Sequence, residues 1–128
     1  MPLEKIATKQ APAAIGPYSQ AVAAGGFLFV SGQIPLDPAS GQVVAGGIRE
    51  QATQVFANLR AILAARGRGF DHVVKTEVFL KNLGDFATMN EVYAAHFPGP
   101  VQPARQAIEA ARLPKDVLIE VSCIASLE

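Results

Sequence analysis

The spacing of apolar residues divides the chain into helix-type and strand-type segments, and this division limits which folds are possible. The first helix-type segment carries a continuous apolar stripe at helical spacing, formed by Ile48, Ala52, Val55, Phe56, Leu59, Ile62 and Leu63. Gly46 and Gly47 precede the stripe, and Gly67 and Gly69 follow it. Because glycine is typical of helix ends, we expect one long helix between these pairs.

A second and shorter helix is predicted near the C-terminal third of the chain. Asp85 can cap its N-terminus, and the segment 98–100, with its two prolines, ends it. One face of this helix is apolar and consists of Phe86, Met89, Tyr93 and Phe97.

The remaining segments have the β-branched and aromatic composition of strands. Gly25 and Gly26 form a two-residue hairpin signal between two short apolar runs. Besides a short strand near Ile6, we expect strands at 21–24, 27–30, 72–80, 104–110 and 117–125. The order is therefore two strands, a helix, a strand, a helix and two strands, which predicts an α+β fold.

Two helices cover only one face of such a sheet, so the other face is left for a partner. The segment 117–125 supports this, because both of its alternating sides are largely apolar. Glu120 is the exception, and a carboxylate in such a strand is costly unless it has a partner. Half of the 128 residues are hydrophobic, and the mean hydropathy is +0.25. For a single 13.5 kDa domain over residues 1–128, this content favours self-association.

Charge and composition exclude several classes of function. Lys plus Arg and Asp plus Glu number 11 each, so the chain has no basic patch for nucleic acid and no polybasic membrane anchor. The N-terminus lacks the apolar stretch of a signal peptide, and no run approaches a membrane span. The lone Cys123 forms neither an internal disulfide nor a zinc site. We therefore expect a cytoplasmic protein.

Several well-known catalytic motifs are missing from the sequence. It contains no nucleophile elbow, no phosphate-binding loop and no dinucleotide fingerprint. His72 and His96 do not have metal-ligand spacing, so no metal site is predicted. Cys123 alternates onto the apolar side of its strand, and we expect its thiol to be buried and idle.

Three polar residues are candidates for chemistry, and each also has a structural explanation. Arg105 opens a predicted strand, and its planar fork suits a carboxylate, although a surface acid could pair with it instead. Glu120 could be one half of a structural ion pair. Tyr18 follows a Gly-Pro turn and could be a packing residue.

Five blocks of sequence resemble the RidA (reactive intermediate deaminase, YjgF-type) family. They occur in the family's order over essentially the whole chain, at residues 13–21, 29–35, 73–80 and 85–90 and in a C-terminal block made of 103–105, 111–116 and 119–121. The resemblance implies a mixed sheet with two helices on one face, as in chorismate mutase of the bacillus type. It also implies a homotrimer with substrate clefts between subunits.

The resemblance also assigns roles to individual residues. Arg105 matches the carboxylate-binding arginine of the family, Glu120 the water-positioning acid and Tyr18 a cleft-lining tyrosine. The residues matched to positions around the ligand are Ser31, Gly32, Asn90 and Ala107. Many members have cysteine where this chain has Ala107, which argues against thiol-dependent activity.

The activity implied is hydrolysis of 2-imino acids, such as 2-iminopropanoate and 2-iminobutanoate, to 2-keto acids and ammonia. No metal or cofactor is required by this chemistry, and the partners expected are the small substrate and two further copies of the chain. Two alternatives stay open: a non-catalytic binder of 2-keto or amino acids in the same cleft, and a ribonuclease or translation inhibitor. Glu120 argues against the first, and the balanced charge argues against the second.

Overall fold

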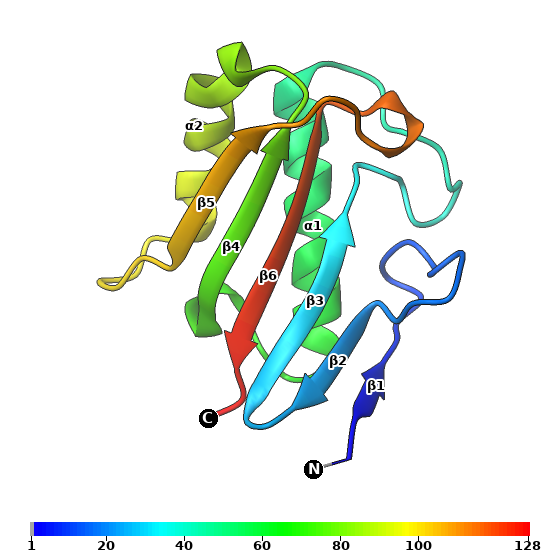
Figure 1. Cartoon of the computed structure of the whole chain (residues 1–128), viewed down its shortest axis with the longest axis vertical. Coiled ribbons are helices and arrows are strands. Elements are labelled where there is room, and N and C mark those ends of the chain that lie inside the picture. Colours follow the sequence, from blue (N-terminus) through cyan, green and yellow to red (C-terminus); the bar gives the residue numbers. More distant parts are fainter. Residues whose placement is uncertain (1) are drawn as a thin grey trace.

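The computed structural model describes residues 2–128 and contains six strands and two α-helices (Figure 1). The strands are β1 (Glu4–Ile6), β2 (Ala21–Ala24), β3 (Phe27–Gln33), β4 (Val73–Leu80), β5 (Ala104–Glu109) and β6 (Ile119–Ser126). The helices are α1 (Ile48–Ala65) and α2 (Phe86–His96). Short 3-10 turns lie at Phe70–His72, Leu83–Asp85 and Pro114–Asp116. The α+β class and the predicted order of elements, including the short strand at Ile6, are confirmed.

All six strands form one mixed sheet in the order β1-β2-β3-β6-β4-β5. Only β4 and β5 are parallel, and α2 connects them. The C-terminal strand β6 lies between β3 and β4 and pairs antiparallel with both. Strand pairing therefore brings the last segment of the chain to the middle of the sheet.

Both helices lie behind the sheet in the view of Figure 1, on the same face. The apolar stripe of α1 is buried against this face from Ala52 to Leu63, as its helical spacing predicts, and Ile48 at its start is partly buried. The buried side of β6 alternates with a half-buried side and consists of Ile119, Val121, Cys123 and Ala125. Burial of apolar surface stabilises a fold by about 25 cal/mol per Å², and this helix-covered layer holds the hydrophobic core.

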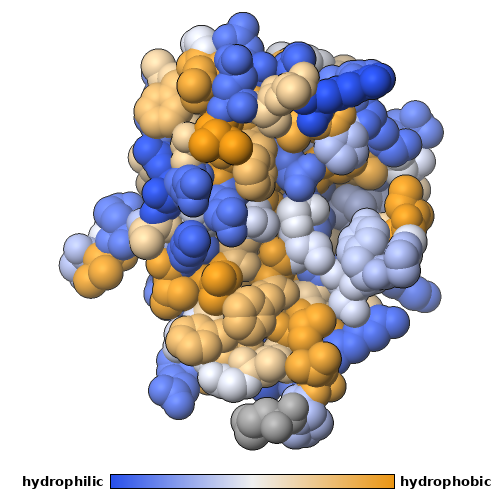
Figure 2. Space-filling model, in the orientation of Figure 1, coloured by the Kyte–Doolittle hydropathy of each residue, from blue (hydrophilic) through white to orange (hydrophobic). Residues whose placement is uncertain are grey.

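The opposite face of the sheet carries apolar side chains that are left partly exposed by the described residues 2–128. Phe27 and Phe29 are 42% and 45% exposed, and Phe29 pairs with the half-buried Ile124 across β3 and β6. Figure 2 shows hydrophobic side chains gathered over the lower part of these strands. The prediction that the helices leave one apolar face free is thus confirmed for the single chain.

Three details differ from the sequence-based expectation. Strand β3 continues three residues past its predicted end, because Gln33 still pairs with Val121 of β6, and Ser31 and Gly32 therefore lie within it. Asp85 lies at the N-cap position of α2, but its side chain makes no capping hydrogen bond. The chain already turns helically from Leu83, so the Asn82 side chain caps that turn by accepting a hydrogen bond from the Gly84 N–H at 2.8 Å. In addition, β6 begins at Ile119, because the Val117 N–H closes the preceding turn onto Pro114. Within residues 2–128, neither helix combines the length and apolar content that a membrane span needs.

Candidate active site in two half-pockets

Arg105 is held by aromatic rings and an amide on the helix-covered side of the sheet. It lies opposite Thr76 of β4, whose side chain is buried under α2. Its Nη1 donates a hydrogen bond of 2.6 Å to Asn90 Oδ1, and its guanidinium carbon lies 4.8 Å from the centre of the Tyr93 ring. Phe86 adds a second ring at 5.3 Å. The cation–π contacts and the Asn90 amide orient the guanidinium group and leave its other N–H groups available to a ligand.

No acid pairs with Arg105 among the described residues. The alternative of a surface ion pair is therefore not what the structure contains. A pocket of about 600 Å³ lies beside the guanidinium and is lined by Asn90, Tyr93, Ala94, Phe97, Pro98, Gln102, Pro103 and Arg105. Gln102 closes one side, where its Nε2 donates to the Phe97 carbonyl at 2.8 Å.

Tyr93 forms the floor of this pocket and stays protonated near neutral pH. Its hydroxyl hydrogen-bonds to Thr76 Oγ1 at 2.8 Å. Burial raises the pKa of Tyr93 above its ordinary value, although the Thr76 bond and the nearby Arg105 charge act in the opposite direction. The ring therefore presents a neutral face to the guanidinium.

Glu120 lies in a second pocket and directly over a glycine. A Cβ placed on Gly32 would approach the Glu120 carboxyl carbon to 3.0 Å and would collide with an oxygen. Partial burial raises the pKa of Glu120, because the charged form loses hydration there. Glu120 has no ion-pair partner within residues 2–128, so it is not half of a structural ion pair in this chain.

The pocket around Glu120 has a volume of about 340 Å³. Its walls are mostly apolar, and its lining consists of Pro12, Ala13, Ile15, Tyr18, Gln20, Gly32, Gln33, Ile34, Leu36, Pro114, Lys115 and Glu120. An apolar pocket with one carboxylate and one phenol suits a small organic substrate more than a highly charged polymer.

The segment that carries Tyr18 is fixed to β3 by Ser31. Ser31 Oγ donates a hydrogen bond of 2.6 Å to the Ser19 carbonyl, and the Ser31 N–H donates to the Gln20 carbonyl. The Tyr18 N–H donates to the Gly16 carbonyl, which closes a tight turn. The Tyr18 side chain itself is 50% exposed at the rim of the pocket. Ser31 thus has a clear structural role beside the site.

Arg105 and Glu120 lie on opposite faces of the sheet within one chain. Arg105 pairs with Thr76, and Glu120 pairs with Phe79, three residues further along β4. Since side chains alternate along a strand, an odd separation places them on different faces. The structure therefore places Asn90 and Arg105 in one pocket and Tyr18, Gly32 and Glu120 in the other. We call these two pockets the half-pockets of the candidate site. Ala107 lines neither pocket and packs against the core.

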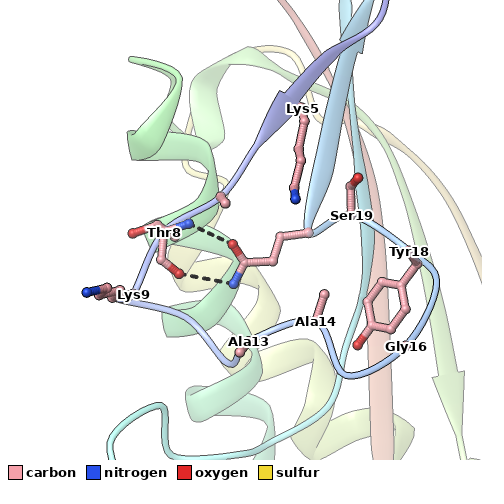
Figure 3. Close-up of a pocket in the computed structure, with 10 residues that line it drawn as sticks. Lys5, Thr8, Lys9, Ala13, Ala14, Gly16, Tyr18 and Ser19 are labelled. Atoms are coloured by element: carbon pink, nitrogen blue, oxygen red, sulfur yellow. Dashed lines mark hydrogen bonds between the residues drawn. The ribbon is translucent and has the colours of Figure 1, made fainter.

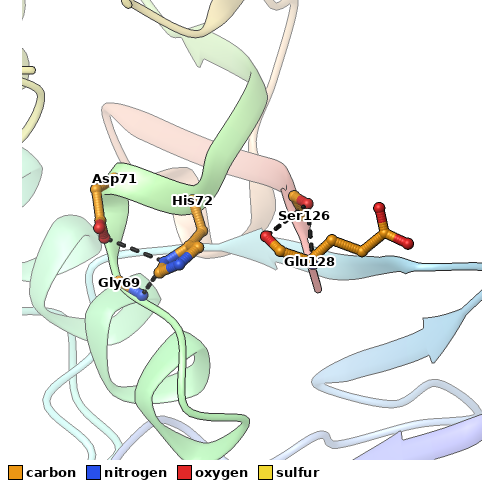
Figure 4. Close-up of polar contacts among 5 residues, drawn as sticks. All are labelled: Gly69, Asp71, His72, Ser126 and Glu128. Atoms are coloured by element: carbon orange, nitrogen blue, oxygen red, sulfur yellow. Dashed lines mark hydrogen bonds and ion pairs between the residues drawn. The ribbon is translucent and has the colours of Figure 1, made fainter. Parts of the chain in front are cut away.

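The cysteine and the two histidines lie outside both half-pockets. Cys123 is buried, and burial raises the pKa of its thiol to about 12. His96 stacks on Phe56 with ring centres 4.8 Å apart, and burial lowers its pKa. His72 accepts a hydrogen bond from the Gly69 N–H and lies 3.2 Å from Asp71 at the start of β4 (Figure 4). Within residues 2–128, His, Cys, Asp and Glu form no cluster of three that could hold a metal ion.

Sequence reasoning did not identify several residues that build these half-pockets. Tyr93 and Phe86 were predicted only as one apolar helix face, and their contact with Arg105 depends on how α2 packs over β5. Gln20 is buried and bonds to Thr8 N, Thr8 O and Pro12 O at 2.7 to 3.1 Å. In the sequence, only the position of this glutamine directly before an apolar strand could have indicated that it holds the loop.

Comparison with known proteins gives consistent matches over nearly the whole chain. The family described as Endoribonuclease L-PSP matches residues 8–127. A RutC family protein from Pyrococcus horikoshii is 55% identical over 98% of both chains. The 2-iminobutanoate/2-iminopropanoate deaminase of Mus musculus is 50% identical over 94% of this chain and 88% of its own length. The crystal structure of a Rid family protein from Yersinia pestis superposes with a TM-score of 0.95 at 42% identity, covering 98% of this chain and 99% of that one. The chain therefore belongs to the Endoribonuclease L-PSP family, the group of RidA and RutC proteins that its sequence motifs indicate.

Proposed function

We propose that this protein is a deaminase that hydrolyses 2-imino acids, such as 2-iminopropanoate and 2-iminobutanoate, to 2-keto acids and ammonia. The observation that carries the proposal is the Glu120 carboxyl, which lies over Gly32 with a raised pKa in a small apolar pocket. A carboxyl group whose pKa is raised by burial is a stronger proton acceptor than an ordinary one, which suits general acid–base catalysis. The deaminase name of the mouse relative supports the same reaction.

The proposed site is completed between subunits of a homotrimer. A single chain places Arg105 and Glu120 on opposite faces of its sheet, so one substrate reaches both only if neighbouring chains meet. The uncovered apolar face with Phe27 and Phe29 supplies a surface for that contact. Closed rotational symmetry then gives each subunit interface one complete site.

In the proposed mechanism, Arg105 binds the substrate carboxylate. Its fork is already oriented by Asn90 and by the ring of Tyr93, so two parallel hydrogen bonds fix the plane of the imino acid. This orientation exposes the C=N carbon to a water molecule. Positioning of this kind supplies much of the rate enhancement, because a protonated imine is already a good electrophile.

Glu120 acts on the water and then on the leaving group. As a carboxylate, it accepts a proton from the water while the new C–O bond forms at the imine carbon and the C=N π electrons move to nitrogen. It then returns that proton to nitrogen. The C–N bond breaks as the C=O bond forms, the carboxylate takes the hydroxyl proton, and ammonia and the 2-keto acid leave. Tyr18, at the rim of the same pocket, donates a hydrogen bond to the substrate. The proposed reaction requires no cofactor.

The test is keto-acid release from freshly generated 2-iminopropanoate, compared with the uncatalysed rate at the same pH. We expect clear acceleration by the wild-type protein and none by the double variant Arg105→Ala, Glu120→Gln. Binding of 2-oxobutanoate without any acceleration of hydrolysis would instead identify a non-catalytic sensor. Both substituted positions are exposed or half-buried, so we expect the double variant to fold, and circular dichroism checks this.

The family description makes ribonuclease activity a second candidate. The equal numbers of basic and acidic residues do not favour it, since RNA binding depends on excess positive charge. We expect no cleavage of a single-stranded RNA probe at physiological salt. Cleavage that survives Glu120→Gln would support the ribonuclease alternative.

A further inference from the structure

A third pocket adjoins the Glu120 pocket and shares Tyr18 with it. It has a volume of about 500 Å³ and is bounded by the loop that joins β1 to β2. Ala13, Tyr18 and Gln20 line both pockets. The proposed deaminase mechanism makes no use of this cavity.

The charged groups of this pocket are all basic. Lys5 and Lys9 belong to its lining, which contains no acidic residue. Figure 3 shows the ammonium end of Lys5 directed towards the loop with Ser19 and Tyr18, whereas Lys9 points outward. Lys5 has no ion-pair partner within residues 2–128. One unpaired ammonium therefore faces the cavity.

The remaining wall is rigid and partly apolar. The Gln20 side-chain oxygen accepts a hydrogen bond from the Thr8 N–H, and its Nε2 donates to the Thr8 and Pro12 carbonyls. These bonds stabilise the loop and leave the amide unavailable to a ligand. The methyl groups of Ala13 and Ala14 form an apolar patch opposite the lysine (Figure 3). A single cation beside small apolar groups fits a singly charged anion with a short carbon chain.

We propose that this pocket is a binding site for small aliphatic monocarboxylates, with Lys5 as the group that binds the carboxylate. The ligand would pack its carbon chain on Ala13 and Ala14 and would contact the Tyr18 ring. Because Tyr18 also lines the Glu120 pocket, occupancy would limit the movement of that ring. The binding claim does not depend on imine hydrolysis.

The test is a titration of the assembled Arg105→Ala protein with butyrate, followed by the chemical shifts of backbone amides. Arg105→Ala removes carboxylate binding at the proposed active site, so any remaining binding belongs elsewhere. We expect saturable shifts at Thr8, Ala14 and Ser19. Butyramide has the same shape without charge, and we expect it to give no saturable shifts.

Variants of the two lysines provide the matched comparison. We expect Lys5→Met in the same background to weaken butyrate binding about tenfold or more, and Lys5→Arg to retain it. Lys9→Met should change the affinity less than twofold, since Lys9 points away from the pocket. The proposal is overturned if butyrate does not saturate, if butyramide binds equally, or if Lys5→Met binds like its parent. Tighter binding of inorganic phosphate than of butyrate would overturn the assignment to monocarboxylates.

Discussion

Because Gly32 lies in close contact with Glu120, the methyl group added by Gly32→Ala should affect the site. A Cβ at position 32 collides with the carboxylate, but the carboxylate is the movable end of a side chain. We expect Gly32→Ala to keep the fold and to displace Glu120, lowering kcat/KM for 2-iminopropanoate at least about tenfold. The measurement is the steady-state rate together with thermal unfolding.

Gly99→Ala is the matched control, because nothing lies within 4 Å of a Cβ at that position. We expect this variant to have wild-type kinetics. Full activity in Gly32→Ala would show that the position of the Glu120 carboxylate does not limit the reaction.

The raised pKa of Glu120 predicts a gain of stability on its removal. A carboxyl group whose pKa is higher in the folded state stabilises the fold only below its ordinary pKa of about 4.3, and this contribution is lost as pH rises through the folded pKa. Glutamine does not titrate. We therefore expect Glu120→Gln to melt at a higher temperature than wild type at pH 7 and at nearly the same temperature at pH 4.

The same variant should lose activity, by about 10² or more if Glu120 is the general base. Melting curves from pH 4 to pH 8 and rates on 2-iminopropanoate check the two effects separately. If Glu120→Gln is instead less stable than wild type at pH 7, Glu120 has a cationic partner in the assembled protein.

Substitution of Arg105 by lysine tests whether catalysis needs the charge of this side chain or its planar geometry. Lysine keeps the positive charge but cannot form two parallel hydrogen bonds with a carboxylate, and it also loses the planar contact with Tyr93. We expect Arg105→Lys to lose one to two decades of kcat/KM, about 1.5–3 kcal/mol, and to approach Arg105→Ala. Rates for the two variants decide this, and near-wild-type activity of Arg105→Lys would reduce the role of Arg105 to a charge.

At the scale of elements, α1 fixes a loop of the Glu120 pocket through Asn58. Its Nδ2 donates to the carbonyls of Ile34 and Leu36 at 3.2 and 3.0 Å, and both of these residues line that pocket. We expect Asn58→Ala to lower the free energy of unfolding by about 2–4 kcal/mol, because two partly buried carbonyls lose their donor. Urea denaturation measures this effect.

Thr53→Ala on the exposed side of the same helix is the control. Thr53 Oγ1 bonds only to the Arg49 carbonyl one turn earlier, so we expect a change within about 0.5 kcal/mol. Equal effects of the two substitutions would mean that the Asn58 contacts with the loop do not matter for stability.

At the scale of the whole molecule, the separation of Arg105 and Glu120 predicts complementation between inactive chains. Each variant alone, Arg105→Ala or Glu120→Gln, removes one half of every site. In randomly mixed trimers, an interface with both wild-type residues forms about a quarter of the time, so about a quarter of the activity should return. Co-refolding of the two variants in equal amounts is the experiment.

Sedimentation equilibrium gives an independent check of the assembly, with an expected mass about three times the 13.5 kDa of the chain. A monomer that hydrolyses imines would contradict the shared site. So would mixed chains that stay inactive although they form trimers.

Local patterns in the sequence were sufficient for the elements of secondary structure and for the buried side of each. The stripe of α1, the Gly25-Gly26 hairpin and the burial of Cys123 all follow from periodicities of 3.6 and 2, which depend only on neighbours along the chain. The sequence pattern also indicated Arg105, Glu120 and Tyr18 as candidates, and the resemblance of five blocks to a family added their roles and the remaining site residues. Both sources are independent of how the elements pack.

Only the tertiary structure decided where those residues lie relative to one another. Strand β6 pairs with β3 and β4 across long stretches of chain, and that register places Glu120 opposite Phe79 and Arg105 on the other face. The capping role of Asn82 and the support of Arg105 by Tyr93 likewise depend on packing. Strand order and register are set by long-range hydrogen bonds and burial, which leave no signature in the spacing of residues along the sequence.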